Sequence, residues 1–278
     1  MTERPARRPV TTHLGEVLRT EWLTPHLIRV TLGGEGLAAF VDNGFTDRYV
    51  KLVFPRPGVD YPEPFDVGRI REELPRDQHP VTRTYTVRWC DTATHELAID
   101  FVYHGDEGIA APWAAAAKPG DTLAMLGPGG AYGPDPEADW HLLVGDESAL
   151  PAIASALEEV PAGKPVKAFV EVENVDEQIA LTCDGDLELT WLHRASDGDI
   201  VRAVRELDFA AGDVHVFVHG EAGFVLELRR HLLNERAVPR ERLSLSGYWR
   251  RGKNEDGWQA EKADTARAER EAAAAKSA

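Results

Sequence analysis

Two arginines and a tyrosine lie close together in one short segment that has the composition of a β-strand. The segment reads Arg83-Thr84-Tyr85-Thr86-Val87-Arg88. A guanidinium binds phosphate through a fixed fork of donors, and a tyrosine offers a flat face on which another ring can stack. Because side chains alternate along a strand, we expect Arg83 and Tyr85 on the same face. The segment therefore favours a site for a planar, anionic cofactor.

A turn further along the chain offers a second way to bind an anion. The stretch from Gly108 to Trp113 follows an alternating strand and begins an alanine-rich helix. Free backbone N–H groups at a helix start favour negative charge.

The alternative interpretation of residues 83–88 is a structural strand, in which the arginine lies at the surface and the tyrosine packs in the core.

The composition predicts a globular chain of two domains and excludes several kinds of partner. The chain has 278 residues, of which 43% are hydrophobic and 28% charged, and its net charge is -16. Such an acidic chain is a poor general partner for nucleic acid or an anionic membrane surface, so an anionic substrate would need a local basic patch. The two cysteines, Cys90 and Cys183, have no metal-ligand or redox spacing. We therefore expect a reducing compartment and no metal site in the protein.

The amino-terminal segment does not resemble a targeting signal. Residues 1–10 contain arginines but no apolar core of the kind that a signal peptide has. No apolar run approaches the length of a membrane span. We predict a cytoplasmic protein without membrane insertion.

The first half of the chain is predicted to form an antiparallel β-barrel. Short alternating segments recur at close intervals, as in all-β folds, and residues 55–80 are predicted to be a long surface loop because they contain many prolines and charges. The expected strands cover 17–20, 27–32, 49–54, 83–89, 96–103 and 122–126, and a helix is expected near 109–117.

The second half alternates strands with helices, which predicts a mostly parallel sheet. Ligands of such sheets bind beyond the carboxyl ends of the strands, here at the turns 145–148, 193–196 and 220–222. Expected strands cover 140–144, 166–172, 187–192, 214–219 and 243–249, and expected helices cover 149–160, 200–207 and 223–236. We predict domains at 1–134 and 135–254, followed by a helical or disordered tail at 255–278.

The order of these segments resembles the siderophore-interacting proteins, a family of FAD-dependent ferric-siderophore reductases of the ferredoxin reductase type. The resemblance implies a FAD-binding barrel followed by a Rossmann-like domain that binds NADPH or NADH. It covers residues from about 15 to 253 and no single segment carries it alone. The matching segments are 83–88, 100–105 with Trp113-Ala114, 127–132, 145–152, 191–194, 220–222 and 247–252.

The resemblance also implies which barrel residues bind FAD. Arg83 would pair with the pyrophosphate, Tyr85 would pack on the flavin, and Thr86 would lie near flavin N5. The family has Pro and Ser where this chain has Ile109 and Ala111, so one hydroxyl contact to phosphate is lost. The other expected FAD-binding residues are Thr84, Asp100, His104, Gly108, Ala110, Ala111 and Trp113.

In the second domain the resemblance points to residues at the strand ends. Gly-x-Gly-x-x-Gly is absent after the first parallel strand, so phosphate would be bound by a helix start and by arginines. Arg194 is the first candidate for a 2′-phosphate, and Arg229 and Arg230 are the weaker ones. The remaining expected nucleotide-binding residues are Asp146, Glu147, Ser148 and Glu221, although Asp146 would also suit a helix N-cap.

Two aromatic residues and three cations complete the expected site. Tyr248 and Trp249 would shield the flavin and move when the nicotinamide stacks, which makes them catalytic candidates beside Tyr85 and Thr86. Lys51, Arg250 and Lys253 are the candidates for an anionic ferric siderophore.

The activity implied is electron transfer from NADPH or NADH, or from a ferredoxin, through FAD to siderophore-bound Fe(III), by a monomer. The alternatives are a flavin oxidoreductase with a non-iron acceptor and a siderophore-binding protein without redox activity.

Overall fold

The chain divides by its contacts into two compact units. The computed structural model describes residues 11–196, 198–253, 257–258, 261 and 267. The barrel unit comprises Met1–Pro136, Pro151–Gly163 and Val175–Gly185, and the sheet unit comprises Glu137–Leu150, Lys164–Asn174 and Asp186–Ala278. The expected boundary at residue 134 stays a prediction. Most of the expected tail at 255–278 lies outside the described residues.

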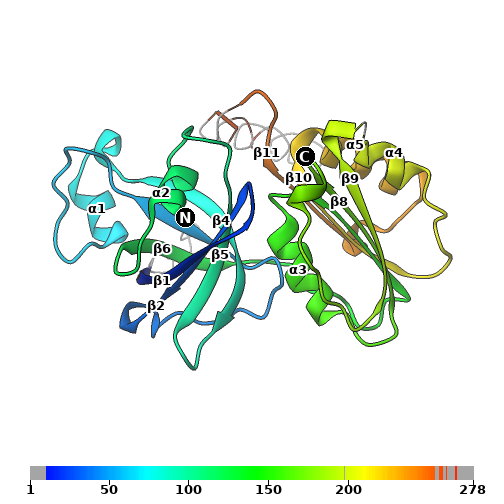
Figure 1. Ribbon diagram of the computed structural model, residues 1–278, viewed down its shortest axis with the longest axis horizontal. Helices are drawn as coiled ribbons and strands as arrows, with labels where there is room; N and C mark the ends of the chain where they lie inside the picture. The colour runs from blue at the N-terminus through cyan, green and yellow to red at the C-terminus, as the bar shows by residue number, and fades with distance from the viewer. Residues whose placement is uncertain (1–10, 197, 254–256, 259–260, 262–266, 268–278) are drawn as a thin grey trace, which may run out of the picture. The chain divides into compact units, whose positions relative to one another are not determined.

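The barrel unit contains a closed antiparallel barrel, as expected. Its strands follow the order β1-β2-β5-β4-β3-β6 around the barrel (Figure 1). Closure leaves no strand edge without a hydrogen-bonding neighbour. The strands are β1 Thr12–Thr24, β2 Leu27–Gly33, β3 Tyr49–Phe54, β4 Val81–Asp91, β5 Glu96–Val102 and β6 Thr122–Gly129.

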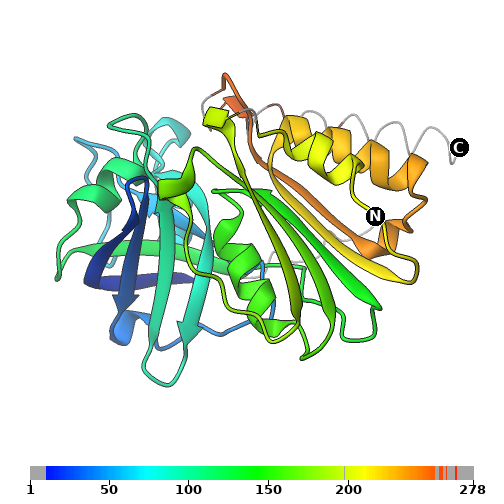
Figure 2. The same ribbon diagram turned by 45° about the vertical axis from the view of Figure 1, so that its right-hand side comes forward.

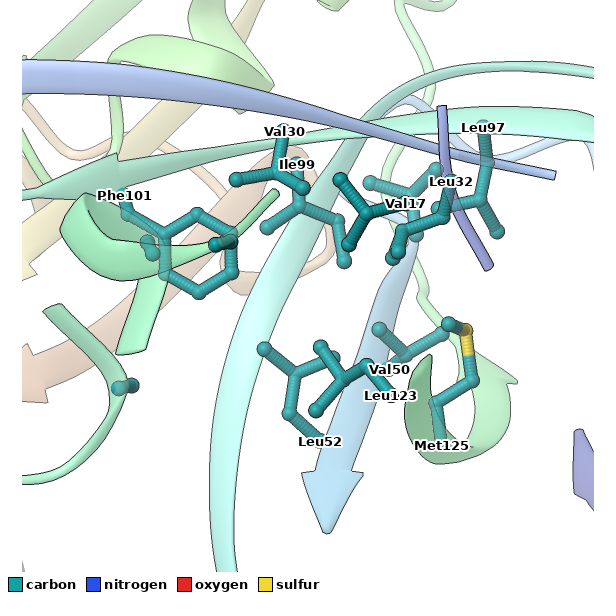
Figure 3. Packing of buried hydrophobic residues seen from close by; sticks show 14 of the residues in the cluster. Val17, Val30, Leu32, Val50, Leu52, Leu97, Ile99, Phe101, Leu123 and Met125 are labelled. Carbon is teal, nitrogen blue, oxygen red and sulfur yellow. The ribbon is translucent and has the colours of Figure 1, made fainter. Parts of the chain in front are cut away.

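Alternating side chains fill the inside of the barrel. On β3, Val50 and Leu52 are buried, whereas Tyr49 and Lys51 are exposed. Figure 3 shows Val50 and Leu52 in the core with aliphatic side chains from other strands, and the short helix α2 (Ala110–Ala116) adds Ala110 and Ala114 to the same cluster. The period of two that predicted the strands is therefore the pattern that builds this core.

The prediction of a loop throughout residues 55–80 is wrong, because this stretch contains helix α1 (Val67–Glu73) and a 3₁₀ turn (Arg76–Gln78). Asp66 caps α1 by accepting a hydrogen bond from the Arg69 N–H at 2.7 Å. Val67 and Ile70 of α1 are buried. So short a helix between prolines is hard to predict from sequence, because two buried positions are too few to show helical periodicity.

Three further elements belong to the barrel unit, two of them distant from the barrel in sequence. They are the 3₁₀ turn Glu35–Leu37, helix α3 Leu150–Glu159 and the 3₁₀ turn Val175–Glu177.

The sheet unit contains a five-stranded parallel sheet with the order β11-β10-β7-β8-β9. The parallel prediction is confirmed. Helices α4 and α5 pack against the sheet through a shared apolar cluster (Figure 2). The strands are β7 Trp140–Asp146, β8 Pro165–Val172, β9 Asp186–His193, β10 Val214–Glu221 and β11 Leu243–Trp249, and the helices are α4 Ile200–Arg205 and α5 Ala222–Arg230, the latter continued by a π-helical turn at His231–Glu235.

Strand β10 runs directly into α5, so the turn expected at 220–222 is absent. Gly220 has φ +134°, and a Cβ there would lie 2.7 Å from the Asp146 carboxyl carbon. Only glycine allows this close approach of β10 to Asp146.

Candidate functional site

Strand β4 presents Arg83 and Tyr85 on the face predicted from its alternation. On the neighbouring strand β3, Leu52 lies opposite Arg83 and Val50 lies opposite Tyr85. Both of these β3 side chains point into the barrel core. The Arg83 guanidinium donates to the Thr82 carbonyl at 3.0 Å. The phosphate-binding and ring-stacking groups that the sequence suggested therefore share one face.

Tyr85 is half-buried at the end of a row of aromatic rings. Its ring lies 4.6 Å from Phe101, and Phe101 lies 5.9 Å from Trp113, which also packs edge-on against Phe54. Trp113 and Tyr85 are both half-buried and both pack against the barrel core. Thr86 lies on the opposite face of β4 and is buried.

Arg88 has a structural partner in helix α3. Its Nη1 donates to Glu158 Oε2 at 3.0 Å, and its carbonyl accepts the Ser155 hydroxyl at 2.6 Å. The guanidinium and the backbone of Arg88 therefore both anchor α3.

Asp100 and His104, two expected FAD-binding residues, differ in their freedom to bind a ligand. Asp100 is buried, and each of its carboxylate oxygens accepts an N–H of Arg29 at 2.7 Å. His104 is exposed in the turn that follows β5. The contacts of Asp100 favour a structural role, and both assignments stay predictions.

The start of α2 retains donors for an anion. Gly108 has φ +83°, and Ile109 at the N-cap makes no side-chain hydrogen bond to the first turn. Ala110 is buried and Ala111 is half-buried. A guanidinium, uncapped N–H groups and an aromatic face fit the phosphates and flat ring of FAD.

The three expected substrate cations fall into two groups. Lys51 is exposed on the outside of β3 beside Thr84 of β4. Arg250 and Lys253 both pair with Glu261, Arg250 at 3.3 Å. Glu261 therefore partly neutralises the second group.

Asp146 is the centre of a hydrogen-bond network at the carboxyl edge of the sheet. Its Oδ1 accepts the Ser148 N–H and hydroxyl, and its Oδ2 accepts the Glu221 N–H and the Trp249 indole N–H, both at 2.8 Å. Burial and the neighbouring Glu147 charge raise the pKa of Asp146 to about 6, although these hydrogen bonds oppose the shift. The network joins four expected site residues from three segments of the chain.

Glu221, rather than Asp146, is the helix cap of this network. Its Oε2 accepts the N–H groups of Gly223 and Phe224 in the first turn of α5. The Asp146 side chain instead closes a turn onto Ser148. Helix α3 begins at Leu150, four residues after Asp146, so the Asp146 carboxylate accepts N–H groups ahead of the helix in the described hydrogen bonds.

Arg194 follows β9 and is surrounded by three carboxylates. Nη1 donates to Glu147 at 2.8 Å and to Glu171 at 3.2 Å, and Nε donates to Glu173 at 3.3 Å. Burial disfavours the charge of Arg194, but the contacts with Glu147 and Glu171 outweigh this and raise its pKa. Sequence reasoning missed Glu171 and Glu173, whose only signal is their position at the end of a buried parallel strand.

Tyr248 is oriented by a histidine that the sequence did not single out. His219 is buried, stacks on Phe217, and joins Tyr248 Oη to Ser244 Oγ through its two ring nitrogens, each at 2.9 Å. Trp249 is fixed by Asp146, so the two neighbouring aromatics have separate polar anchors.

Two features are absent from the described residues. No helix among them is both long and apolar enough to cross a membrane. No group of three or more His, Cys, Asp or Glu side chains in that part of the chain is arranged to hold a metal ion.

Comparison with known proteins matches both halves of the chain to one family. Residues 16–132 match the siderophore-interacting FAD-binding domain, and residues 138–252 match the siderophore-interacting protein model. Among solved structures, the siderophore-interacting protein SipS from Aeromonas hydrophila has 30% identity and a TM-score of 0.76, covering 91% of this chain and 97% of its own. The ferredoxin reductase of carbazole 1,9a-dioxygenase, at 18% identity and a TM-score of 0.63, shares the fold; it covers 88% of this chain and 71% of its own.

Curated relatives match over most of the length of both chains. An uncharacterized protein of Mycobacterium tuberculosis is 45% identical over 95% of this chain and 98% of its own. The ferric vibriobactin reductase ViuB of Vibrio cholerae is 33% identical over 89% of this chain and 92% of its own. The NADPH-dependent ferric-chelate reductase of Escherichia coli is 36% identical over 84% of this chain and 91% of its own. This chain belongs to the siderophore-interacting protein family.

Proposed function

We propose that this chain is a ferric-siderophore reductase, which passes electrons from a nicotinamide dinucleotide through FAD to siderophore-bound Fe(III). The observation that carries the proposal is its similarity, over most of both chains, to the two reductases of Vibrio cholerae and Escherichia coli. Barrel and sheet both contain groups suited to the two nucleotides, which supports a redox enzyme over a siderophore-binding protein without activity.

The barrel unit would hold FAD. Arg83 would pair with the pyrophosphate together with the N–H groups at the start of α2, and Tyr85 would pack on the flavin ring. Core packing of Phe101 against Tyr85 would fix the ring before the cofactor binds. FAD held there would supply the conversion of two-electron transfer from the nicotinamide into one-electron transfer to Fe(III).

The carboxyl edge of the sheet would bind the nicotinamide dinucleotide. In open sheets of this type ligands bind beyond the carboxyl ends of the strands, where Asp146, Glu221 and Trp249 form their network. Asp146 would hold the Trp249 indole until the nicotinamide stacks, and the movement expected of this aromatic would break that hydrogen bond. His219 would do the same for Tyr248.

Lys51, Arg250 and Lys253 would attract the anionic ferric siderophore. The chain carries a net charge of -16, so local cations must offset the repulsion of such a substrate. Siderophore oxygens are hard ligands that bind Fe(III) better than Fe(II), so reduction alone weakens the complex. No general acid or base is required of the protein.

The cellular setting follows from composition. Two unpaired cysteines in a chain of this length fit a reducing compartment, so we infer that Fe(II) is released in the cytoplasm. The monomer stays an expectation. A reduced ferredoxin remains the alternative donor.

Anaerobic mixing tests the proposal. FAD-loaded protein is mixed with NADH, NADPH or a reduced ferredoxin, and loss of flavin absorbance identifies the donor. A panel of ferric siderophores with an Fe(II) trap follows, and we expect flavin reoxidation together with Fe(II). A reduced flavin that reacts with no ferric chelate would overturn the assignment and favour a different acceptor.

A further inference from the structure

The carboxylates around Arg194 change what this arginine can recognise. We propose that Glu147, Glu171 and Glu173 select NADH over NADPH as the electron donor. The inference rests on the proposed function, because it assumes that this sheet edge receives a nicotinamide dinucleotide. NADH and NADPH differ at one position, the adenosine ribose, which carries a 2′-hydroxyl in NADH and a 2′-phosphate in NADPH.

The guanidinium of Arg194 already donates hydrogen bonds to acidic side chains. Glu147 accepts hydrogen bonds from both terminal nitrogens, Glu171 shares Nη1 at 3.2 Å, and Glu173 accepts from Nε at 3.3 Å. All three guanidinium nitrogens thus donate to carboxylates. A 2′-phosphate would have to replace these ion pairs, and the carboxylates would then face it without their cation.

The local charge balance also opposes a 2′-phosphate. Three carboxylates surround Arg194, and Arg251 is a second cation that acts on Glu171. Burial raises the pKa of Glu171, although Arg194 opposes this shift. A dianionic group added to this excess of negative charge is repelled, whereas a neutral ribose hydroxyl is not.

The position of two of these acids fits contact with a ribose. Glu171 and Glu173 lie at the carboxyl end of β8, the second strand of the parallel sheet along the chain. In dinucleotide-binding folds an acidic residue following the first βα unit accepts a hydrogen bond from the ribose 2′-hydroxyl. Glu173 has the most exposed carboxylate of the three and is the one best placed to do so.

The Escherichia coli relative is named NADPH-dependent, so the proposal predicts a difference in donor between two members of one family. It also reverses the expectation that Arg194 binds the 2′-phosphate. In our account Arg194 is a positioning residue that holds the carboxylates in place.

Binding without turnover tests the proposal. Calorimetry measures ADP-ribose and 2′-phospho-ADP-ribose on the full-length protein, and we expect ADP-ribose to bind more tightly by about tenfold, or about 1.4 kcal/mol. The double variant Glu171→Gln with Glu173→Gln should bring the two affinities to within about threefold, mainly by improving 2′-phospho-ADP-ribose binding. Glu188→Gln removes one carboxylate charge from an exposed side chain that pairs with Lys167 on the same sheet, and should leave the preference unchanged.

The ratio of flavin reduction rates with NADH and NADPH is the second measurement. We expect NADH to reduce bound flavin faster at equal low concentration, and the double variant Glu171→Gln with Glu173→Gln to narrow this difference mainly by raising the rate with NADPH. Equal or tighter binding of 2′-phospho-ADP-ribose, binding of neither ligand, or an unchanged rate ratio in the double variant would each overturn the selection. Such results leave ferric-siderophore reduction intact, because that activity is measured separately with chemically reduced flavin.

Discussion

The β4–α2 region of the barrel and the carboxyl edge of the sheet, the proposed sites of FAD and of the nicotinamide donor, present opposite charges. The first offers a guanidinium, backbone N–H groups and an aromatic face. The second offers carboxylates, whose hydrogen bonds are largely used within the protein. Both FAD and the nicotinamide donor carry a pyrophosphate, so we expect the two proposed sites to bind their ligands with different strength. Cations suit a cofactor that stays bound, and an acidic edge suits a donor that must leave after each turnover.

The largest effect is expected at Asp146 on the acidic edge. Asp146→Ala leaves the N–H groups of Ser148, Glu221 and Trp249 without their acceptor, and should lower the free energy of unfolding by about 3 kcal/mol. Urea unfolding followed by tryptophan fluorescence measures the loss. Asp186→Ala, at the exposed amino end of β9, is the control and should stay within about 0.5 kcal/mol of wild type. Equal stability of the two variants would mean that the acidic edge is not a structural network.

Arg83 and Arg88 test the cationic region. Arg83→Ala should raise the Kd for FAD about 30-fold, or about 2 kcal/mol, because a charge-assisted contact to phosphate is lost. Arg88→Ala should keep the Kd within about threefold but lower the Tm, since Arg88 holds helix α3 through Glu158. FAD titration of apoprotein measures both values. An equal loss of affinity in the two variants would contradict the assigned face of β4.

Substitution of Asp100 tests whether its carboxylate stabilises the fold or binds FAD. Asp100→Asn weakens the two-pronged contact with Arg29 and should cost about 1.5 kcal/mol of stability, with FAD affinity changed less than about twofold. Thermal unfolding and FAD titration of one preparation provide both numbers. A large loss of FAD affinity at unchanged Tm would restore the cofactor role expected from the sequence.

The smallest effect concerns pH, where two buried carboxylates should act with opposite signs. Burial would raise the pKa of Glu177, but hydrogen bonds from Thr24 at 2.6 Å and from His26 lower it below the ordinary 4.5. Its stabilisation is therefore present above pH 4.5 and is lost as pH falls below that value. Glu177→Gln should cost about 1 kcal/mol at neutral pH, and this deficit should shrink at acidic pH.

The contribution of Asp146 to stability changes with pH in the opposite direction, because the pKa of its carboxyl is raised from 3.8 to about 6. Its protonated form stabilises the fold below pH 3.8, and this contribution is lost as pH rises through about 6. The deficit of Asp146→Ala should consequently be larger at pH 4 than at pH 7. Unfolding curves across this range measure both variants, and parallel pH profiles of the two would contradict the pKa assignments.

Local patterns predicted most of the architecture. The alternation of Val50 and Leu52 with exposed neighbours predicted a barrel strand, and the same period placed Arg83 and Tyr85 on one face. Helix α1 was missed because it is short and lies between prolines. Strand periodicity depends on neighbours in sequence, so it succeeds where several residues repeat the pattern.

The contacts of the site residues were less predictable. Glu147, Glu171 and Arg194 come from the ends of three different strands, and nothing in their local sequence indicates that they meet. The pairing of Asp100 with Arg29 depends likewise on the register of β2 and β5. Sequence therefore identified the types of residue at the site, whereas the charge that each presents to a ligand depends on pairing across strands.

Electron counting tests the central claim most directly. Protein with one bound FAD and no free flavin is given a limiting amount of NADH and an excess of ferric siderophore under anaerobic conditions, and trapped Fe(II) is counted. The account predicts about two Fe(II) for each NADH oxidised, because the nicotinamide gives two electrons and each iron accepts one. Oxidation of NADH without Fe(II), or Fe(II) formation that requires added free flavin, would contradict it.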